Sequence, residues 1–229
     1  MRRRPFLAGL LLPAAAPAVA GGASLASPDE TVLAPDDDER ALDAAQRAAV
    51  TALGPRIVDA ADPVAGNPLG DVLLVVFTDP LCPFCRRLVP TVYALLDADH
   101  AAKVVWKDIP VLGPASQLEA RALLAAQRQG GYEALQRALA ETPGPLGRDD
   151  LRDLADALDL DGNALLRDLD DPAIKVRLAA NIALAQFLHV EGTPATVVGG
   201  RVVPGAVHLD DLAEIVAGAR ATGAGTPAP

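Results

Sequence analysis

The spacing of apolar residues along the chain alternates between two periods, which predicts both strands and helices. A continuous apolar, largely β-branched run from Val72 to Phe77 is typical of a strand buried on both faces of a sheet. Lys103 to Ile109 predicts a second strand, which ends at Pro110. A short strand, a Gly-Gly hairpin turn and another short strand are expected at 195–198, 199–200 and 201–203.

Helical periodicity accounts for most of the remaining chain. Ser116 and Glu119 have the spacing of a capping box, and Asp171-Pro172 places proline at the favoured first position of a helix. Two prolines and two glycines between Ala60 and Gly70 break the helical pattern. Helices are expected at 39–57, from the cysteine pair to 96, after 116, and at 132–141, 149–158, 161–169, 171–189 and 209–221. This order predicts a small α/β sheet with a block of helices inserted between its halves.

The first twenty residues have the layout of a bacterial export signal. Arg2 to Arg4 form a basic head, and the apolar stretch from Leu7 to Ala20 is too short to span a bilayer as a mature helix. Ala18-Val19-Ala20 supplies small residues for cleavage, and Arg3-Arg4-Pro5-Phe6-Leu7 is similar to the twin-arginine pattern. The alternatives are a Sec signal with a basic head and an uncleaved anchor. We expect a periplasmic protein.

The charge of the chain excludes one class of partner. Its 20 Lys and Arg against 30 Asp and Glu give a formal net charge of −10. Residues 1–20 carry three arginines and no acid, so their removal leaves 209 residues with a charge of −10 − 3 = −13. Phosphate binding needs clustered Lys and Arg, so no nucleic-acid partner is expected.

The two cysteines of the chain, Cys82 and Cys85, enclose only Pro83 and Phe84. A disulfide within the chain can therefore close only this small loop, which is too short to stabilise a fold by restricting the unfolded state. At the first turn of a helix, free N–H groups and the helix dipole stabilise a thiolate. This spacing favours redox chemistry over a metal site or inert packing. Zinc prefers four ligands, and the histidines lack motif spacing with the pair: His100, His189 and His208.

Three separated segments resemble the DsbA-like thiol–disulfide oxidoreductases: Phe77-Thr78-Asp79-Pro80-Leu81-Cys82-Pro83-Phe84-Cys85, Lys107-Asp108-Ile109-Pro110-Val111-Leu112-Gly113-Pro114 and Gly192-Thr193-Pro194-Ala195. The similarity covers roughly residues 66 to 220. It implies an α/β, thioredoxin-like fold with an inserted all-helical domain and an extra N-terminal helix. The expected organisation is a signal peptide at 1–20, a flexible leader at 21–38, the N-terminal helix at 39–62, a thioredoxin-like domain at 66–111 and 190–221, the helical insertion at 112–189 and a disordered tail at 222–229.

The resemblance also implies roles for the site residues. Cys82 would form the mixed disulfide with a client protein, and Cys85 would resolve it. Pro194 would be cis and pack beside the cysteines, which leaves the backbone of Thr193 free to pair with an extended client strand. Pro83 and Phe84 complete the active site, with no cofactor and no metal.

The expected partners are cysteine-containing exported proteins and an unidentified redox partner that recharges the pair. The same site can insert, reduce or isomerise disulfides, so the direction stays open. The N-terminal helix would either form a homodimer or pack on its own domain. A non-catalytic chaperone-like module and a copper- or zinc-handling protein are the alternatives from other functional classes.

Two positions depart from the family pattern. Many thioredoxin-fold enzymes carry a buried acid six residues before the first cysteine, where this chain has Val76; Asp79 lies nearer the pair. Lys107 would either supply a charge near the site or be solvated. Phe84 stands where the strongly oxidising members have His, which implies a less oxidising pair, because a neutral ring cannot stabilise the thiolate as an imidazolium can.

Overall fold

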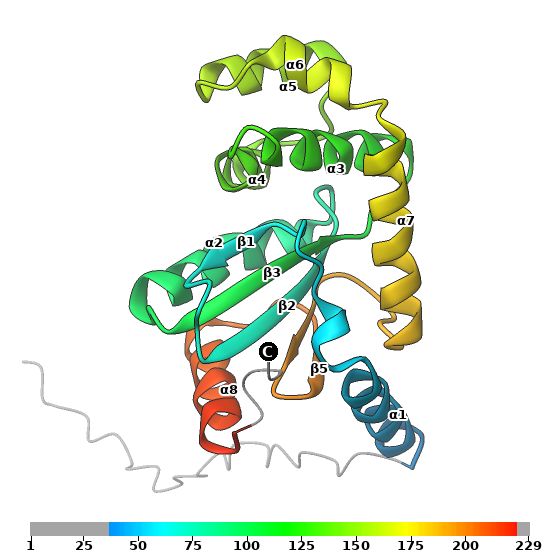
Figure 1. The fold of residues 1–229 in the computed structure, drawn as a ribbon, viewed down its shortest axis with the longest axis vertical. Coiled ribbons are helices and arrows are strands. Elements are labelled where there is room, and N and C mark those ends of the chain that lie inside the picture. The colour runs from blue at the N-terminus through cyan, green and yellow to red at the C-terminus, as the bar shows by residue number, and fades with distance from the viewer. Residues whose placement is uncertain (1–36, 224–229) are drawn as a thin grey trace, which may run out of the picture. The chain divides into compact units, whose positions relative to one another are not determined.

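The computed structural model describes residues 37–223, which belong to one compact unit (Figure 1). The helices are α1 (Asp37–Leu53), the 3₁₀ helix η1 (Gly54–Ile57), α2 (Pro83–Ala98), α3 (Pro114–Gln127), α4 (Tyr132–Glu141), α5 (Arg148–Ala157), α6 (Gly162–Asp168), α7 (Pro172–Phe187) and α8 (Leu209–Ala221). The strands are β1 (Val64–Gly66), β2 (Val72–Thr78), β3 (Ala102–Asp108), β4 (Ala195–Val198) and β5 (Arg201–Pro204). The expected signal segment 1–20, most of the leader 21–38 and the tail from 224 lie outside the described residues.

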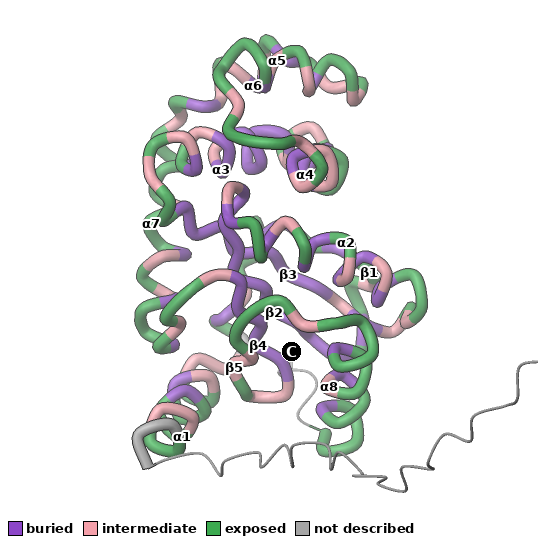
Figure 2. The backbone as a smooth tube through the Cα atoms, turned by 180° about the vertical axis from the view of Figure 1, so that it is seen from behind, coloured by how far each residue is buried: buried purple, intermediate pink, exposed green. Residues whose placement is uncertain are grey.

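The five strands form one mixed sheet in the order β1-β3-β2-β4-β5. The central strands β2 and β3 run parallel, with Thr78 opposite Asp108 at their carboxyl ends, and the other pairs are antiparallel. Every residue of β2 is buried, as its continuous apolar run predicts. Buried positions accordingly gather along the central strands in Figure 2.

The two faces of the sheet support separate apolar cores. Leu74, Val76 and Trp106 point to the face covered by α2 and α8, and this core continues into the inserted helices. Val75 and Phe77 point to the opposite face, where they pack with residues of α1, η1 and α7. The alternation of side chains along a strand explains this division. Helix α1 thus packs on its own domain, which is one of the two roles expected for it.

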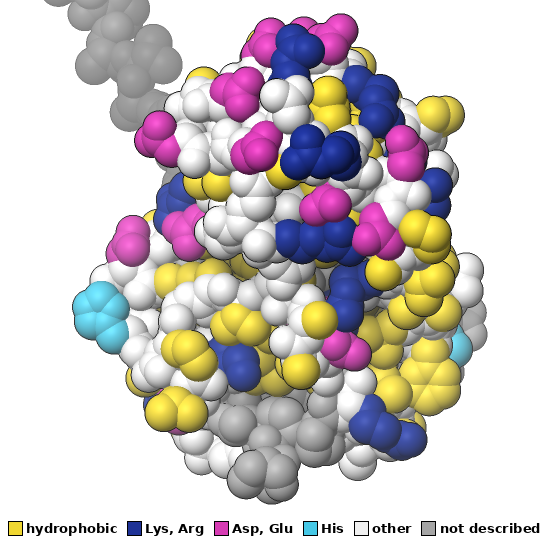
Figure 3. All heavy atoms as spheres, turned by 45° about the horizontal axis from the view of Figure 1, so that its top comes forward, with side chains coloured by type: hydrophobic (Ala, Val, Ile, Leu, Met, Phe, Trp, Pro, Cys, Tyr) yellow, Lys and Arg dark blue, Asp and Glu magenta, His cyan; other side chains and the backbone are white. Residues whose placement is uncertain are grey.

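The inserted helices α3 to α6 share a core of buried leucines that includes Leu123, Leu139, Leu151 and Leu165. Helix α7 then returns the chain to the sheet (Figure 1). On the face shown in Figure 3, acidic and basic side chains intermingle over these helices, and the basic ones form no continuous patch. Ion pairs such as Arg128–Asp171 at 2.6 Å accompany this mixture.

The sequence pattern did not indicate β1. This edge strand has only three residues, of which one is buried, and it pairs antiparallel with β3. Gly66 has φ +76°, and a Cβ there would lie 2.6 Å from a methyl group of Leu96. The composition that breaks the helical pattern therefore allows a short strand to pass close to α2.

One expected helix start is wrong, and one expected helix is divided. The helix expected at 39–57 forms as α1, which begins at Asp37, followed by a 3₁₀ turn from Gly54, whose φ is +49°, to Ile57. The expected capping box does not form, because α3 begins at Pro114 with Gly113 as N-cap. The buried Glu119 carboxylate instead accepts a hydrogen bond from the N–H of Leu146 at 2.9 Å.

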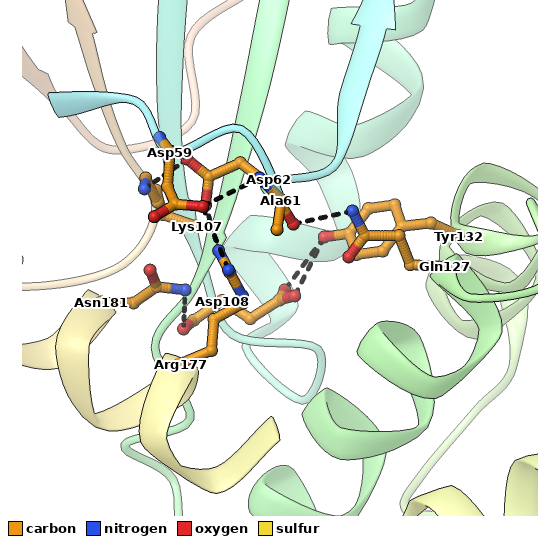
Figure 4. Close-up of polar contacts among 9 residues, drawn as sticks. All are labelled: Asp59, Ala61, Asp62, Lys107, Asp108, Gln127, Tyr132, Arg177 and Asn181. Atoms are coloured by element: carbon orange, nitrogen blue, oxygen red, sulfur yellow. Dashed lines mark hydrogen bonds and ion pairs between the residues drawn. The ribbon is translucent and has the colours of Figure 1, made fainter. Parts of the chain in front are cut away.

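A buried ion pair fixes β3 against the segment that leads into β1. The ammonium of Lys107 lies 2.6 Å from the carboxylate of Asp62, and both side chains are almost fully buried. Arg177 on α7 reaches the other oxygen of Asp62 at 3.0 Å, and also contacts Asp59 (Figure 4). The expectation of a solvated Lys107 is therefore wrong.

We predict that Lys107→Met destabilises the protein by about 3 kcal/mol, because it leaves the Asp62 carboxylate buried without its ammonium partner. Urea unfolding at pH 7 measures the change. Arg152→Met is the control, since the ion-pair partners of Arg152, Asp149 and Asp153, are exposed and surface ion pairs contribute little; its midpoint should match the wild type. A loss below about 1 kcal/mol for Lys107→Met would show that the pair does not hold this junction.

Candidate active site

Cys82 stands at the corner between β2 and α2. It is the N-cap residue of α2, with φ −69° and ψ 121°, and Pro83 occupies the first turn of the helix. The N–H of Cys82 donates to the carbonyl of Asp79 at 3.0 Å, which closes a turn ahead of the helix. This position aims the positive end of the α2 dipole at the thiol. Both cysteines are free thiols.

The loop before β4 crosses over the first cysteine. The peptide bond between Thr193 and Pro194 is cis, as the resemblance implied. The Sγ of Cys82 donates to the carbonyl oxygen of Thr193 at 3.3 Å, across 111 residues of sequence. The structure thus brings together the site residues expected on two distant segments. Cys82 retains only 5% exposure, and Cys85 only 1%.

Cys85 lies one turn further along α2, beneath Cys82. Its Sγ accepts a hydrogen bond from the N–H of Asp79 at 3.4 Å. Burial raises the pKa of Cys85 to about 12, although hydrogen bonds from Asp79, Thr193 and Thr78 oppose this rise. Cys85 is therefore a thiol at neutral pH, and it must lose a proton before it can attack a disulfide.

Asp79 joins two loops at the carboxyl ends of the parallel strands. Its side chain is fully buried, and one carboxylate oxygen accepts from the N–H of Leu81 at 2.8 Å. The other oxygen accepts from the N–H groups of Val111 and Leu112 at 2.8 and 3.1 Å. The loop that carries Cys82 is thereby tied to the loop between β3 and α3.

Arg86 and Arg87 follow the pair on α2 and contact different parts of the structure. Arg86 turns toward the inserted helices, where its guanidinium donates to the carbonyl oxygens of Pro80, Thr142 and Gly144. The guanidinium of Arg87 lies over the ring of Phe84, 4.4 Å from its centroid. Arg86 therefore connects the active-site corner to the helical insertion.

Phe84 belongs to an apolar rim that remains accessible near the site. Its side chain is 53% exposed, and Val111 and Leu112 on the loop tied by Asp79 are 57% and 52% exposed. Large apolar side chains held in solvent around a reactive group favour contact with apolar segments of another molecule.

A small cavity beneath the cysteines is lined by Thr78, Asp79, Pro80, Cys85, Arg86, Val89, Asp108, Leu123, Gln136, Leu139 and Ala140. Its volume for the centre of a water molecule is about 10 Å³, which is roughly the room that one water needs. Burial raises the pKa of Asp108 to about 7, and the negative charge of Asp79 adds to this rise. The hydroxyl of Tyr132 donates to the two Asp108 oxygens at 3.2 and 3.1 Å (Figure 4).

Sequence reasoning missed Asp108 and gave no role to Asp79. Both acids stand where the two parallel strands end, because Asp108 pairs with Thr78 in the register and Asp79 follows directly. Acids at adjacent carboxyl ends of parallel strands could have indicated a shared site. Lys107 and Val76 do not line the cavity.

The histidines lie on other elements than the cysteine pair. His208 is the N-cap of α8, His189 follows the end of α7, and His100 lies in the turn before β3. Among residues 37–223, no group of three or more His, Cys, Asp or Glu side chains could hold a metal ion.

Comparison with known proteins gives a consistent set of matches. The model of the DSBA-like thioredoxin domain matches residues 73–217. A thioredoxin-like oxidoreductase from Silicibacter pomeroyi DSS-3 is similar with a TM-score of 0.68 and 41% identity, over 71% of this chain and 94% of that chain. A linker-deletion variant of Proteus mirabilis ScsC gives a TM-score of 0.73 and 30% identity, over 80% and 86%. A periplasmic thioredoxin-like protein from Salmonella enterica serovar Typhimurium gives 0.64 and 27%, over 77% and 96%. The expected thioredoxin-like fold with inserted helices is confirmed.

The curated relatives are longer proteins. Na(+)/H(+) antiporter NhaA 1 of Salinispora arenicola is 32% identical over 160 residues, which are 69% of this chain and 24% of that protein. NhaA 3 of Salinispora tropica is 31% identical over 83% of this chain and 29% of that protein. The chain thus spans roughly a quarter of the length of the curated relatives it matches.

The buried Asp108 carboxyl predicts a pH-dependent stability. Its pKa is raised from 3.8 to about 7 in the folded protein, so its contribution to stability is present below pH 3.8 and is lost as the pH rises through 7. Relative to Asp108→Asn, the wild type should lose up to about 4 kcal/mol between pH 4 and pH 8. Urea unfolding of both proteins at the two pH values measures this difference. An identical difference at pH 4 and pH 8 would contradict the buried, protonated carboxyl.

Proposed function

The chain belongs to the family of DSBA-like thioredoxin domains, and on this premise we propose that it exchanges its Cys82–Cys85 dithiol or disulfide with cysteine-containing client proteins. It is an oxidoreductase of the thiol–disulfide type. The observation that supports this exchange is the asymmetry between the two cysteines. Cys82 meets the cis-proline loop at the helix N-terminus, whereas Cys85 is buried behind it with a raised pKa.

The proposed chemistry follows from this asymmetry. When the pair is reduced, the Cys82 thiolate attacks a client disulfide, forms a mixed disulfide and releases one client thiolate. Cys85 then attacks the Sγ of Cys82, which forms the Cys82–Cys85 bond and releases the second client thiolate. The client gains two electrons and the pair loses two. The reverse sequence inserts a disulfide into a client and leaves the pair reduced.

We propose that the client binds as an extended segment beside the cis-proline loop. Backbone pairing with Thr193 would align the client sulfur with Cys82, after displacing the thiol from the Thr193 carbonyl. The exposed Phe84, Val111 and Leu112 would contact apolar side chains of the client. Such contacts suit unfolded or partly folded proteins, whose apolar residues are accessible.

Export is part of the proposal. The expected signal at 1–20 and a similar periplasmic protein from Salmonella support a periplasmic location, where a separate redox partner would recharge the pair. Within residues 37–223, no helix is both long enough and apolar enough to cross a membrane. Light scattering, which measures the molar mass in solution, tests whether α1 also supports a homodimer.

The cysteine roles predict opposite results for two matched variants. Cys85→Ser should accumulate a covalent complex with a reduced, unfolded client supplied with oxidised glutathione, because the protein lacks the thiol that resolves the bond at Cys82 from within. Cys82→Ser should form no complex and lose at least about 1000-fold in exchange rate, because the remaining thiol is buried. Non-reducing electrophoresis and mass mapping measure both outcomes. A complex linked through Cys85 in the Cys82→Ser protein would reverse the assignment.

The side chain at position 84 is expected to affect the redox equilibrium of the cysteine pair. The variant Phe84→His should shift the equilibrium with glutathione about tenfold toward the reduced pair, making the protein a stronger oxidant, since an imidazolium beside the helix N-terminus stabilises the thiolate. Phe84→Leu is the matched control and should leave the equilibrium constant unchanged. A Phe84→His protein with the wild-type constant would show that this position does not set the oxidising power.

A further inference from the structure

One cavity connects the buried sulfur to a buried acid. Cys85 and Asp108 both line the cavity beneath the pair, although one lies on α2 and the other at the end of β3. The cavity has room for about one water. Cys85 and Asp108 both border the space that such a water would occupy, so the cavity offers a route for the Cys85 proton toward Asp108.

The other charged groups near the cavity form hydrogen bonds or ion pairs with other partners. Asp79 accepts three backbone N–H bonds with its two oxygens, and Arg86 donates to three carbonyl oxygens. Glu119 on α3 lies outside the lining and pairs with Arg86 at 3.6 Å. Lys107 points to the opposite face of β3, where Asp62 holds it.

Asp108 has a different environment. Its side-chain partner among the described residues is the hydroxyl of Tyr132 on α4, which also accepts a hydrogen bond from Gln136 at 3.3 Å. The main-chain carbonyl of Asp108 accepts from Asn181 on α7 at 3.2 Å, so the residue is held from both sides (Figure 4). No described cation contacts the carboxylate. It is thus fixed in position and able to change its protonation state.

We infer that Asp108 accepts the proton of Cys85, through a water in this cavity, when Cys85 resolves the mixed disulfide. The inference rests on the proposed function. In this step the thiol proton passes to the water, and the water passes a proton to the Asp108 carboxylate. The Cys85 thiolate attacks the Sγ of Cys82, the Cys82–Cys85 bond forms, and the client sulfur leaves with the electron pair of the broken bond.

The same residues can transfer the proton when the exchange runs in the opposite direction. When a client thiolate attacks the Cys82–Cys85 disulfide at Cys82, Cys85 leaves as a thiolate in a buried site that disfavours its charge. A protonated Asp108 returns the proton through the water. A carboxyl that titrates near neutral pH can act in both steps, because it is neither fully ionised nor fully protonated there.

The test separates the two cysteines in one experiment. The reduced protein is mixed with 5,5′-dithiobis(2-nitrobenzoate), and release of the coloured thiolate is followed by stopped flow from pH 5 to 10. The first equivalent reports attack by Cys82, and the second reports attack by Cys85 on the mixed disulfide. In the wild type, the second rate should level off above pH about 7, where Asp108 is ionised.

In Asp108→Asn, the second rate at pH 7 should fall about 100-fold and rise with hydroxide concentration without levelling off, while the first changes less than about twofold. Tyr132→Phe removes the hydroxyl that lowers the pKa of Asp108, so the midpoint of the second phase should move to higher pH. Glu119→Gln replaces another buried carboxyl outside the cavity and should retain both wild-type rates.

The outcomes distinguish this inference from the proposed function. If the wild type releases fewer than two equivalents, the exchange chemistry itself fails. If the wild type releases two and Asp108→Asn keeps the second rate and its pH profile, Asp108 is not the acceptor and the exchange chemistry stands. If Asp108→Asn is slow in both phases or misfolds, Tyr132→Phe decides: an unmoved midpoint overturns the inference, and a raised midpoint supports it.

Discussion

The burial of Cys85 is the constraint on which the rest of this site depends. In the proposed exchange, a sulfur with 1% exposure does not meet the client directly and acts on the bond that Cys82 has formed. The same burial raises its pKa and keeps it protonated at neutral pH, so it must lose a proton before it can resolve the mixed disulfide. The different tasks that we propose for the two cysteines therefore follow from their depth, since both are thiols.

Contacts from three parts of the chain hold the cysteine corner in this position. Asp79 ties the cysteine loop to the loop after β3, the carbonyl of Thr193 meets Cys82 from the far end of the sequence, and Arg86 connects α2 to the inserted helices. The insertion also contributes Tyr132, which contacts the acid of the cavity. The helical block thus takes part in building the site.

The sequence predicted those features of the fold and the site whose signal lies within one segment of the chain. The apolar run of β2 indicated its burial, and the pattern placed α8 at 209–221 to the residue. The cis geometry of Pro194 followed from the resemblance. β1 was missed because three residues carry no periodicity. Asp108 was missed because its environment comes from α2, α4 and α7, and no spacing along the chain reports their meeting.

The most direct test of the account is the redox titration of the pair in glutathione buffers, read by intact mass after acid quenching and alkylation. The account predicts one reversible transition in which the unmodified protein loses two hydrogens, with the disulfide mapped between Cys82 and Cys85. A protein that keeps two alkylatable thiols in every buffer would contradict the account, as would one that stays linked in excess dithiothreitol.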